Sequence, residues 1–154
     1  MKIEVSNSNA PVWHDATVSS ELPAALKPLA ELSKNLWWVW NSEAKALFRD
    51  LDPELWRSTG ENPVMVLQRL STDRIEAVTK DKDMVERINA VYADFKAYMA
   101  VPMRTDVPSV SYFSMEYGLC NCLKIYSGGL GVLAGDYIKE ASDSCVDMLS
   151  LIHI

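Results

Sequence analysis

Residues 127–136 read Ser-Gly-Gly-Leu-Gly-Val-Leu-Ala-Gly-Asp, and the interpretation of the C-terminal part of the chain depends on this run. Gly128, Gly129 and Gly131 lie close together, and an apolar pattern typical of a helix follows at once. The first turn of a helix has backbone N–H groups without intrahelical acceptors, and the helix dipole favours negative charge there. Glycine lets an anion approach such groups closely. The run therefore indicates a phosphate cradle.

The spacing of these glycines matches neither of two common phosphate motifs. No Lys-Ser or Lys-Thr follows them, so the run is not a P-loop. With Gly135 included, the intervals also differ from the G-x-G-x-x-G fingerprint of dinucleotide-binding folds. On spacing alone, a tight turn before a helix explains the glycines equally well.

The flanking sequence carries a family resemblance. Residues 110–118 read Val-Ser-Tyr-Phe-Ser-Met-Glu-Tyr-Gly, and together with the glycine run they resemble the bacterial α-glucan (glycogen, starch and maltodextrin) phosphorylases. A second region agrees independently: residues 35–41 read Asn-Leu-Trp-Trp-Val-Trp-Asn and residues 51–56 read Leu-Asp-Pro-Glu-Leu-Trp. These resemble the helical domain that precedes the catalytic region of those enzymes. The resemblance covers about residues 20–148.

The resemblance implies a fold and an activity. The implied fold is a leader (1–19), a mainly α-helical domain (20–107), and the first strand–loop–helix (108–148) of a truncated α/β domain of the glycosyltransferase-B type, which has two Rossmann-like lobes. The implied reaction is cleavage of terminal α-1,4-linked glucose from glycogen or maltodextrin by orthophosphate, giving glucose 1-phosphate. The implied cofactor is pyridoxal phosphate, whose phosphate acts as proton relay.

The resemblance also assigns residues. It places Glu116 in the active-site wall, and it directs the backbone of Gly128, Gly129 and Leu130 at the substrate phosphate, with Gly129 also at the cofactor phosphate. Independently, Glu116 follows a buried strand, and ligands of open α/β sheets bind at that end. The alternative role for Glu116 is a carboxylate that hydrogen-bonds a neighbouring loop. Asp136 has no role in either interpretation.

The resemblance places the cofactor lysine and the charged partners of the phosphates in the distal lobe, beyond Met148. Lys124 and Lys139 match no cofactor-lysine motif. The chain by itself is therefore expected to be inactive.

Two other classes compete with this interpretation. One is a helical interaction module joined to a nucleotide-sugar glycosyltransferase similar to glycogen synthase. Those enzymes place a lysine before their Gly-Gly-Leu loop, whereas Ser127 stands there in this chain. The other is a purely structural helical domain, which leaves residues 110–136 unexplained.

Composition narrows the possible partners. The chain has 154 residues, of which 49% are hydrophobic, and a net charge of −6, which argues against nonspecific nucleic-acid binding. No run has the length of a membrane span and no signal-peptide pattern is present, so we expect a cytoplasmic protein without membrane partners. A homo-oligomer is compatible with the sequence.

The cysteines predict neither a metal site nor a redox motif. An odd count of three, without a secretion signal, favours free thiols. Cys120 and Cys122 would supply only part of a structural zinc site, and His14 is distant in sequence. Their C-x-C spacing also differs from the C-x-x-C of thiol oxidoreductases.

The first helix is expected to open at Glu21-Leu22-Pro23 and to bury one stripe. The tryptophans form either a carbohydrate platform or core, and core packing is favoured, with Trp38 as the best candidate for exposure. The expected stripe is Leu26, Leu29, Leu32, Leu36 and Trp40, and Leu47 and Phe48 join it in the core. The other expected helices cover 43–51, 52–56, 62–70, 81–99 and 129–144, and the expected strands cover 2–5 and 110–115.

The last six residues, Leu-Ser-Leu-Ile-His-Ile at 149–154, do not continue the family pattern. They can be encoded by CTG TCT CTT ATA CAC ATC, which resembles the transposase mosaic end ligated into sequencing libraries. We therefore expect the reading frame to enter adaptor after Met148, and we exclude these residues, with His153, from the fold and the site. The alternative is a genuine apolar strand.

Overall fold

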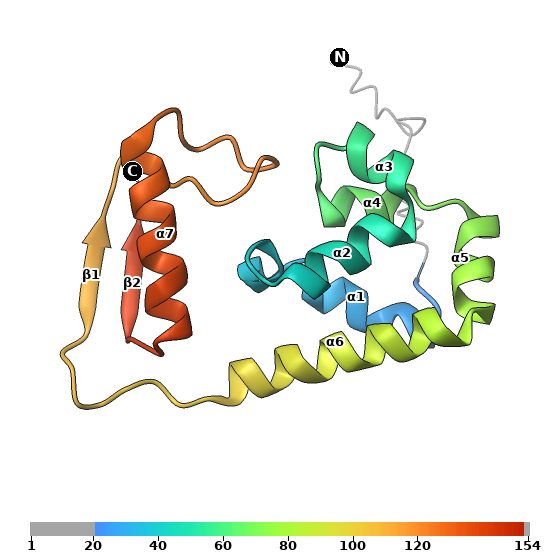
Figure 1. Cartoon of the computed structure of the whole chain (residues 1–154), viewed down its shortest axis with the longest axis horizontal. Helices are drawn as coiled ribbons and strands as arrows, with labels where there is room; N and C mark the ends of the chain where they lie inside the picture. Colours follow the sequence, from blue (N-terminus) through green and yellow to red (C-terminus); the bar gives the residue numbers. More distant parts are fainter. Residues whose placement is uncertain (1–20, 153–154) are drawn as a thin grey trace, which may run out of the picture.

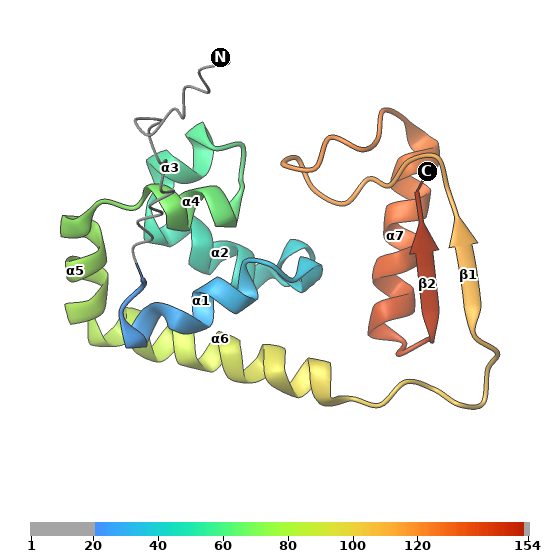
Figure 2. The ribbon, with the colours of Figure 1, turned by 180° about the vertical axis from the view of Figure 1, so that it is seen from behind.

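The computed structural model describes residues 21–152 and consists of a helical region followed by a small α/β unit (Figures 1 and 2). The expected leader, the strand at 2–5, His14 and His153 lie outside these residues. An extended linker joins the two parts. The elements are η1 (Ala24–Leu26), α1 (Lys27–Leu32), η2 (Leu36–Val39), α2 (Ser42–Leu51), α3 (Pro53–Ser58), α4 (Pro63–Arg69), α5 (Thr72–Lys80), α6 (Lys82–Ala100), β1 (Val110–Phe113), α7 (Gly129–Asp143) and β2 (Met148–Leu151).

Short-range capping sets the helix boundaries. The Asn41 side chain accepts a hydrogen bond from the Ala44 N–H at 2.8 Å and begins α2. Asp52 and Asn62 begin α3 and α4 in the same way, each followed by a proline in the first turn. These three boundaries confirm the sequence expectations. The helix α5 was not expected, although the Ser71 side chain caps it.

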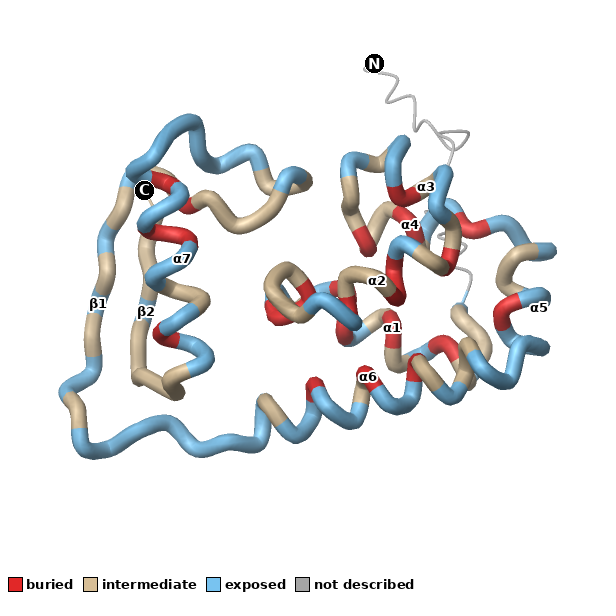
Figure 3. The backbone as a smooth tube through the Cα atoms, viewed as in Figure 1, coloured by how far each residue is buried: buried red, intermediate tan, exposed pale blue. Residues whose placement is uncertain are grey.

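The long helix α6 lies beneath the shorter helices and contacts α1, α2 and α5 (Figure 1). Its expected apolar face is confirmed, because Ile88, Val91 and Phe95 are buried and Met84 and Tyr98 pack partly against the same core. In Figure 3 the buried positions of α6 repeat along the side that faces the other helices. This face of α6 forms one side of the helical core.

The expected stripe is confirmed for Leu26, Leu29 and Leu32, which are buried, and is wrong for Leu36 and Trp40. The first helix ends at Leu32, and a turn at Ser33–Asn35 leads into the 3₁₀ helix η2, so the helical phase is lost. Leu36 is 38% exposed and Trp40 only partly buried, whereas Trp38, the residue expected to be exposed, is 3% exposed.

The core interpretation of the tryptophans is confirmed for the three that are buried, Trp37, Trp38 and Trp56. The Trp38 ring meets Phe48 and Trp56 edge-on, with centroids 6.4 and 6.0 Å apart. Edge-to-face contacts of this kind stabilise aromatic cores beyond the effect of burial.

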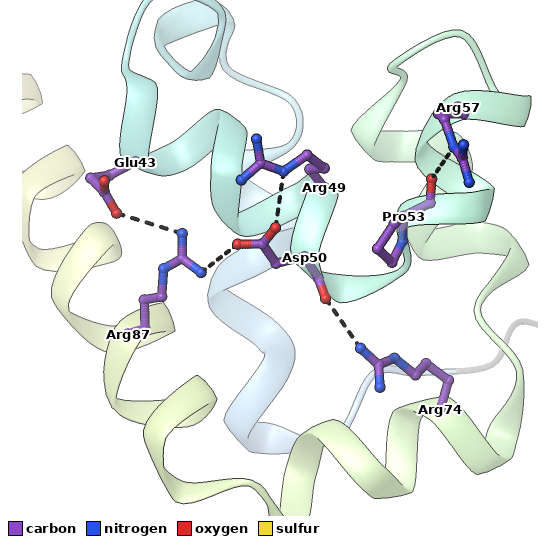
Figure 4. Close-up of polar contacts among 7 residues, drawn as sticks. All are labelled: Glu43, Arg49, Asp50, Pro53, Arg57, Arg74 and Arg87. Atoms are coloured by element: carbon purple, nitrogen blue, oxygen red, sulfur yellow. Dashed lines mark hydrogen bonds and ion pairs between the residues drawn. The ribbon is translucent and has the colours of Figure 1, made fainter.

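A group of arginines ties the helices together at the end of α2 (Figure 4). Arg74 of α5 donates from Nε to the Leu51 carbonyl at 2.5 Å and from Nη2 to the Asp50 carbonyl at 3.1 Å. These carbonyls lie in the last turn of α2, where intrahelical donors are lacking. Arg87 of α6 reaches the Asp50 carboxylate at 2.8 Å and Glu43 at 3.5 Å. The hydrogen bond from Arg87 lowers the Asp50 pKa, and the hydrogen bond from Arg49 contributes less to this lowering.

The α/β unit is one parallel strand–helix–strand crossover. β1 pairs with β2 in the register Val110↔Met148 to Phe113↔Leu151, and α7 packs on β2. Parallel strands require such a crossover, usually through a helix. The expected helix at 129–144 is confirmed, and the expected strand at 110–115 ends at Phe113.

The exclusion of residues 149–154 from the fold is wrong for Leu149–Leu151, which form most of β2. Their backbone completes the hydrogen-bonded ladder with β1, which is the strand alternative noted above. The adaptor origin of this sequence stays a prediction.

Large apolar side chains are exposed on the α/β unit. On α7, Leu133 is 67% exposed beside the buried Ala134. On and near the strands, Phe113 is 70% exposed and Met115 is 75% exposed. The described part of the sheet has two strands, so these side chains have no neighbouring layer. Exposed apolar surface of this kind promotes association.

Two aromatic side chains of the helical region contact the end of α7. Trp40 donates from Nε1 to the Asp143 carboxylate at 2.9 Å, and the Tyr98 hydroxyl donates to the same oxygen at 2.8 Å. Burial raises the pKa of Tyr98 to about 12. The linker adds a backbone bond from the Arg104 N–H to the Cys145 carbonyl at 2.7 Å.

Replacing Trp38 by alanine should destabilise the helical region by about 3–5 kcal/mol, the usual cost of truncating a buried aromatic residue. Trp40→Ala is the matched control and should cost less, because Trp40 is partly exposed. Urea unfolding followed by far-ultraviolet circular dichroism measures both. An equal or larger loss for Trp40→Ala would contradict this assignment of the core.

Leu133→Lys should increase the solubility of the 154-residue chain without lowering its melting temperature, because Leu133 touches solvent. The neighbouring Ala134→Lys is the control and should abolish cooperative unfolding, because it puts a charge into a fully buried position. Sedimentation and thermal melts test both variants. Unchanged aggregation in Leu133→Lys would show that this surface does not drive association.

Candidate anion-binding site

The candidate site lies where β1 leads through a loop into the first turn of α7. Ser114 follows β1, and its hydroxyl donates to the Glu116 carbonyl at 2.8 Å. Tyr117, which follows Glu116 in the sequence, is buried, and its hydroxyl donates to the Tyr112 carbonyl at 3.0 Å. Its backbone N–H donates to the Ile125 carbonyl, also at 3.0 Å. These bonds fix the backbone on both sides of Glu116.

The Glu116 carboxylate occupies part of the expected phosphate cradle. One oxygen accepts from the Ser127 N–H at 2.6 Å and from the Ser127 hydroxyl at 3.2 Å. The other accepts from the Gly131 N–H at 3.0 Å. The structure thus supports the alternative role for Glu116, a carboxylate that hydrogen-bonds a neighbouring loop.

This environment lowers the pKa of Glu116, chiefly through the Ser127 backbone N–H, with the Gly131 N–H and the Ser127 hydroxyl contributing. The carboxylate is therefore ionised at neutral pH. A fixed negative charge beside the start of α7 uses the attraction that a helix N-terminus has for anions. Any further anion must bind next to that charge.

Packing accounts for Gly131 and Gly135. A Cβ on Gly135 would lie 2.1 Å from the Gly118 carbonyl oxygen, and one on Gly131 would lie 2.6 Å from the Tyr126 Cβ. The loop also donates from the Gly118 N–H to the Gly131 carbonyl at 2.6 Å. These glycines let the loop cross α7 in contact with it. The Gly131 N–H, which the glycine run places in the expected phosphate cradle, donates to Glu116 in this structure.

Gly129 and Leu130 differ from Gly131. Both are exposed, and within residues 21–152 no side chain or carbonyl accepts from their backbone N–H groups. A Cβ on Gly129 would meet no atom within 4 Å, and one on Gly128 would first meet the Glu116 carboxylate at 3.9 Å. Open donors and open space therefore remain at Gly129 and Leu130.

The other polar candidates do not join this site. Asp136, for which the sequence suggests no role, accepts from the Lys139 side chain at 3.3 Å. Among the described residues, no group of three or more histidine, cysteine or carboxylate side chains is arranged to hold a metal ion. In the same part of the chain, no helix is both long enough and apolar enough to cross a bilayer. The sequence analysis missed Gly118, whose backbone packs against Gly135 of α7. A single glycine in a loop gives no sign of such a contact.

Comparison with known proteins defines the class of protein first. A family model described as "Protein of unknown function (DUF3417)" matches residues 22–123, and the chain belongs to this family. The match covers the helical region and the start of the α/β unit. No solved structure matches the chain significantly.

Curated relatives then specify the resemblance. The chain is 46% identical over 118 residues to the glycogen phosphorylase of Aquifex aeolicus, which covers 75% of this chain. It is 38% identical over 141 residues to the maltodextrin phosphorylase of Thermococcus litoralis, covering 87% of the chain, and 34% identical over 147 residues to the glycogen phosphorylase of Mycobacterium tuberculosis, covering 88%. The chain spans 17% of each relative's length. These matches confirm the resemblance to α-glucan phosphorylases.

The hydrogen bonds of Glu116 should respond to acid in a defined window. Because the folded-state pKa is depressed, the stabilisation is complete above the ordinary glutamate pKa of about 4.3 and is lost as pH falls through the lower folded value. The amide NMR signals of Ser127 and Gly131 should therefore shift with a midpoint below about pH 4.3. Glu116→Gln is the control and should show no such transition. A midpoint at or above the ordinary value would contradict the hydrogen-bonded carboxylate.

Proposed function

We propose that a full-length protein carrying this chain is an α-glucan phosphorylase that transfers terminal α-1,4-linked glucose to orthophosphate, giving glucose 1-phosphate. The observation that carries the proposal is the set of glycogen and maltodextrin phosphorylases among its relatives. The open N–H groups at the start of α7 support it, since they are suitable donors for phosphate. The partners are the glucan and orthophosphate, and the protein is cytoplasmic.

In this proposal Gly129 and Leu130 hold phosphate through their backbone, and Gly128 gives it room to approach. Glu116 is part of the site wall. It fixes the turn through the Ser127 and Gly131 N–H groups, so the free donors are oriented before an anion arrives. Preorganised donors lose little free energy in reorienting during the reaction.

The open space above Gly129 also fits a cofactor phosphate, because no atom outside its chain neighbours and the backbone of its own helix turn lies within 4 Å of a Cβ built there. Bound pyridoxal phosphate would supply a phosphate group able to exchange a proton with orthophosphate. The lysine that anchors it is not assigned to Lys124 or Lys139, and Lys139 is engaged with Asp136. Uncharged donors alone would hold phosphate weakly, so we expect the 154-residue chain to be inactive.

The domain organisation follows the same proposal. Residues 20–107 are the helical N-terminal domain, and residues 108–148 begin a glycosyltransferase-B type catalytic domain. The parallel crossover from β1 through α7 to β2 is the repeating unit of such doubly wound lobes. The exposed apolar side chains on α7 and β1 are consistent with further layers packing there.

Gly129→Ala in the full-length enzyme should lower the rate of phosphorolysis at limiting phosphate by about tenfold or more, because a methyl group obstructs the donors. Its melting temperature should not change, since the site has room for a Cβ and Gly129 does not have a positive φ. Asp136→Asn, on an exposed part of the same helix, should retain the wild-type rate. Gly135→Ala should instead lower stability through its contact with Gly118.

Steady-state kinetics with maltodextrin and varied phosphate, together with thermal melts, separate these effects. If Gly129→Ala showed a near-normal dependence of rate on phosphate concentration, the glycine run would be a structural turn and not a phosphate-binding site. Glu116→Gln should lower turnover, because it removes the charge and because its one amide oxygen cannot accept from both the Ser127 and the Gly131 N–H groups.

A further inference from the structure

Two cysteines of the loop between β1 and α7 lie unusually close together. The Sγ atoms of Cys120 and Cys122 are 3.1 Å apart, and both residues are free thiols of intermediate burial. In an extended strand, side chains two residues apart share a face, but their Cβ atoms remain too far apart for sulfur contact. A local turn brings them together here, with the Leu123 N–H donating to the Cys120 carbonyl at 3.2 Å.

The surrounding fold holds this turn in place. The loop reaches toward the helical region in both ribbon views (Figures 1 and 2). Cys120 and Cys122 pack partly against the core of that region. Before the cysteines, the Gly118 N–H donates to the Gly131 carbonyl of α7, and after them the Ile125 carbonyl accepts from Tyr117. Both ends of the loop are therefore anchored, and the pair does not depend on chance encounters in a mobile segment.

We propose that Cys120 and Cys122 are a redox modification site that closes to an intramolecular disulfide when the chain meets a small-molecule disulfide such as oxidised glutathione. A disulfide bond is about 2.05 Å long, so the sulfurs need to approach by only about 1 Å. The proposal does not depend on the phosphorylase activity. A closed four-ligand zinc site is the other use of paired thiols, but the described residues supply no third ligand here.

The exchange proceeds in two balanced steps. The Cys120 thiol loses its proton, its sulfur attacks one sulfur of oxidised glutathione, and one glutathione leaves as the thiol. The Cys122 thiol then loses its proton and attacks the Cys120 sulfur, which expels the second glutathione. Two protein thiols are oxidised and one glutathione disulfide is reduced to two thiols.

The environment favours this order. Burial, with a smaller effect from the neighbouring Cys120 thiol, raises the pKa of Cys122 to about 12. Because the thiolate is the reactive form, this burial slows attack by Cys122 on a disulfide in solution more than attack on a sulfur that it already contacts. Once Cys120 carries glutathione, Cys122 is already in contact with the sulfur that it must attack.

The site suits reversible rather than permanent oxidation. Cytosolic disulfides are usually transient and redox-sensing, and a bond across one intervening residue closes a small ring that is easily reduced. Glu116 precedes the two cysteines in this loop, and Ser127 follows them. The Ser127 N–H donates to the Glu116 carboxylate. Closing the pair therefore stiffens the connection between the two sides of the candidate anion site.

Thiol counting on the 154-residue chain tests the proposal. The folded protein is incubated with oxidised glutathione, alkylated with N-ethylmaleimide, and measured by intact mass and peptide mapping. The three described thiols should fall to one alkylated position, at Cys145, with loss of two hydrogen atoms and no attached glutathione. Dithiothreitol should restore all three.

Three variants and one condition make the result decisive. Cys145→Ser should retain the internal disulfide. Cys122→Ser should stop at glutathione on Cys120, whereas Cys120→Ser should react more slowly. In urea, wild-type chain should lose its preference for the 120–122 pair, because the anchored turn is gone. Three alkylated thiols after oxidation of the folded chain, or disulfides that involve Cys145, would overturn the proposal.

Discussion

The contact between the Glu116 carboxylate and the first turn of α7 is the interaction on which the α/β unit depends. It joins the end of β1 to the start of α7 across a loop, with bonds to the Ser127 N–H at 2.6 Å and to the Gly131 N–H at 3.0 Å. A helix start without such a partner would expose several unsatisfied donors. The same contact divides the turn into donors that serve the fold and donors that remain open at Gly129 and Leu130.

The glycines of this run therefore have different structural reasons for being glycine. Gly131 and Gly135 are glycine because the loop crosses α7 too closely for a side chain, and the Gly118 carbonyl is the obstacle at Gly135. Gly129 has no such packing requirement. Glycines that are adjacent in sequence thus fulfil different physical needs, and only those with open space remain candidates for contact with phosphate.

The helical region also makes direct contacts with the α/β unit. Trp40 and Tyr98 both donate to the Asp143 carboxylate at the end of α7, while the cysteine loop packs against the helical core near its other end. The helical region therefore contacts α7 at its C-terminal end and contacts the loop that precedes its N-terminal end. We infer that the helical region helps to set the orientation of α7, and with it the direction of the open N–H groups.

Local sequence determined much of this protein. The caps Asn41, Asp52 and Asn62, the apolar face of α6 and the start of α7 could all be predicted, because each depends on residues within one or two turns of the chain. The motif around the glycines likewise identified the family. Tertiary contacts decided the rest. A turn at Ser33–Asn35 reversed the exposure expected of Trp38 and Trp40. The tertiary fold also brought the Glu116 carboxylate to the Ser127 N–H, eleven residues further along the chain. It paired Leu149–Leu151 with the upstream strand β1. Such pairings depend on the total burial and hydrogen bonding of the assembled fold, and periodicity along the chain carries no record of them.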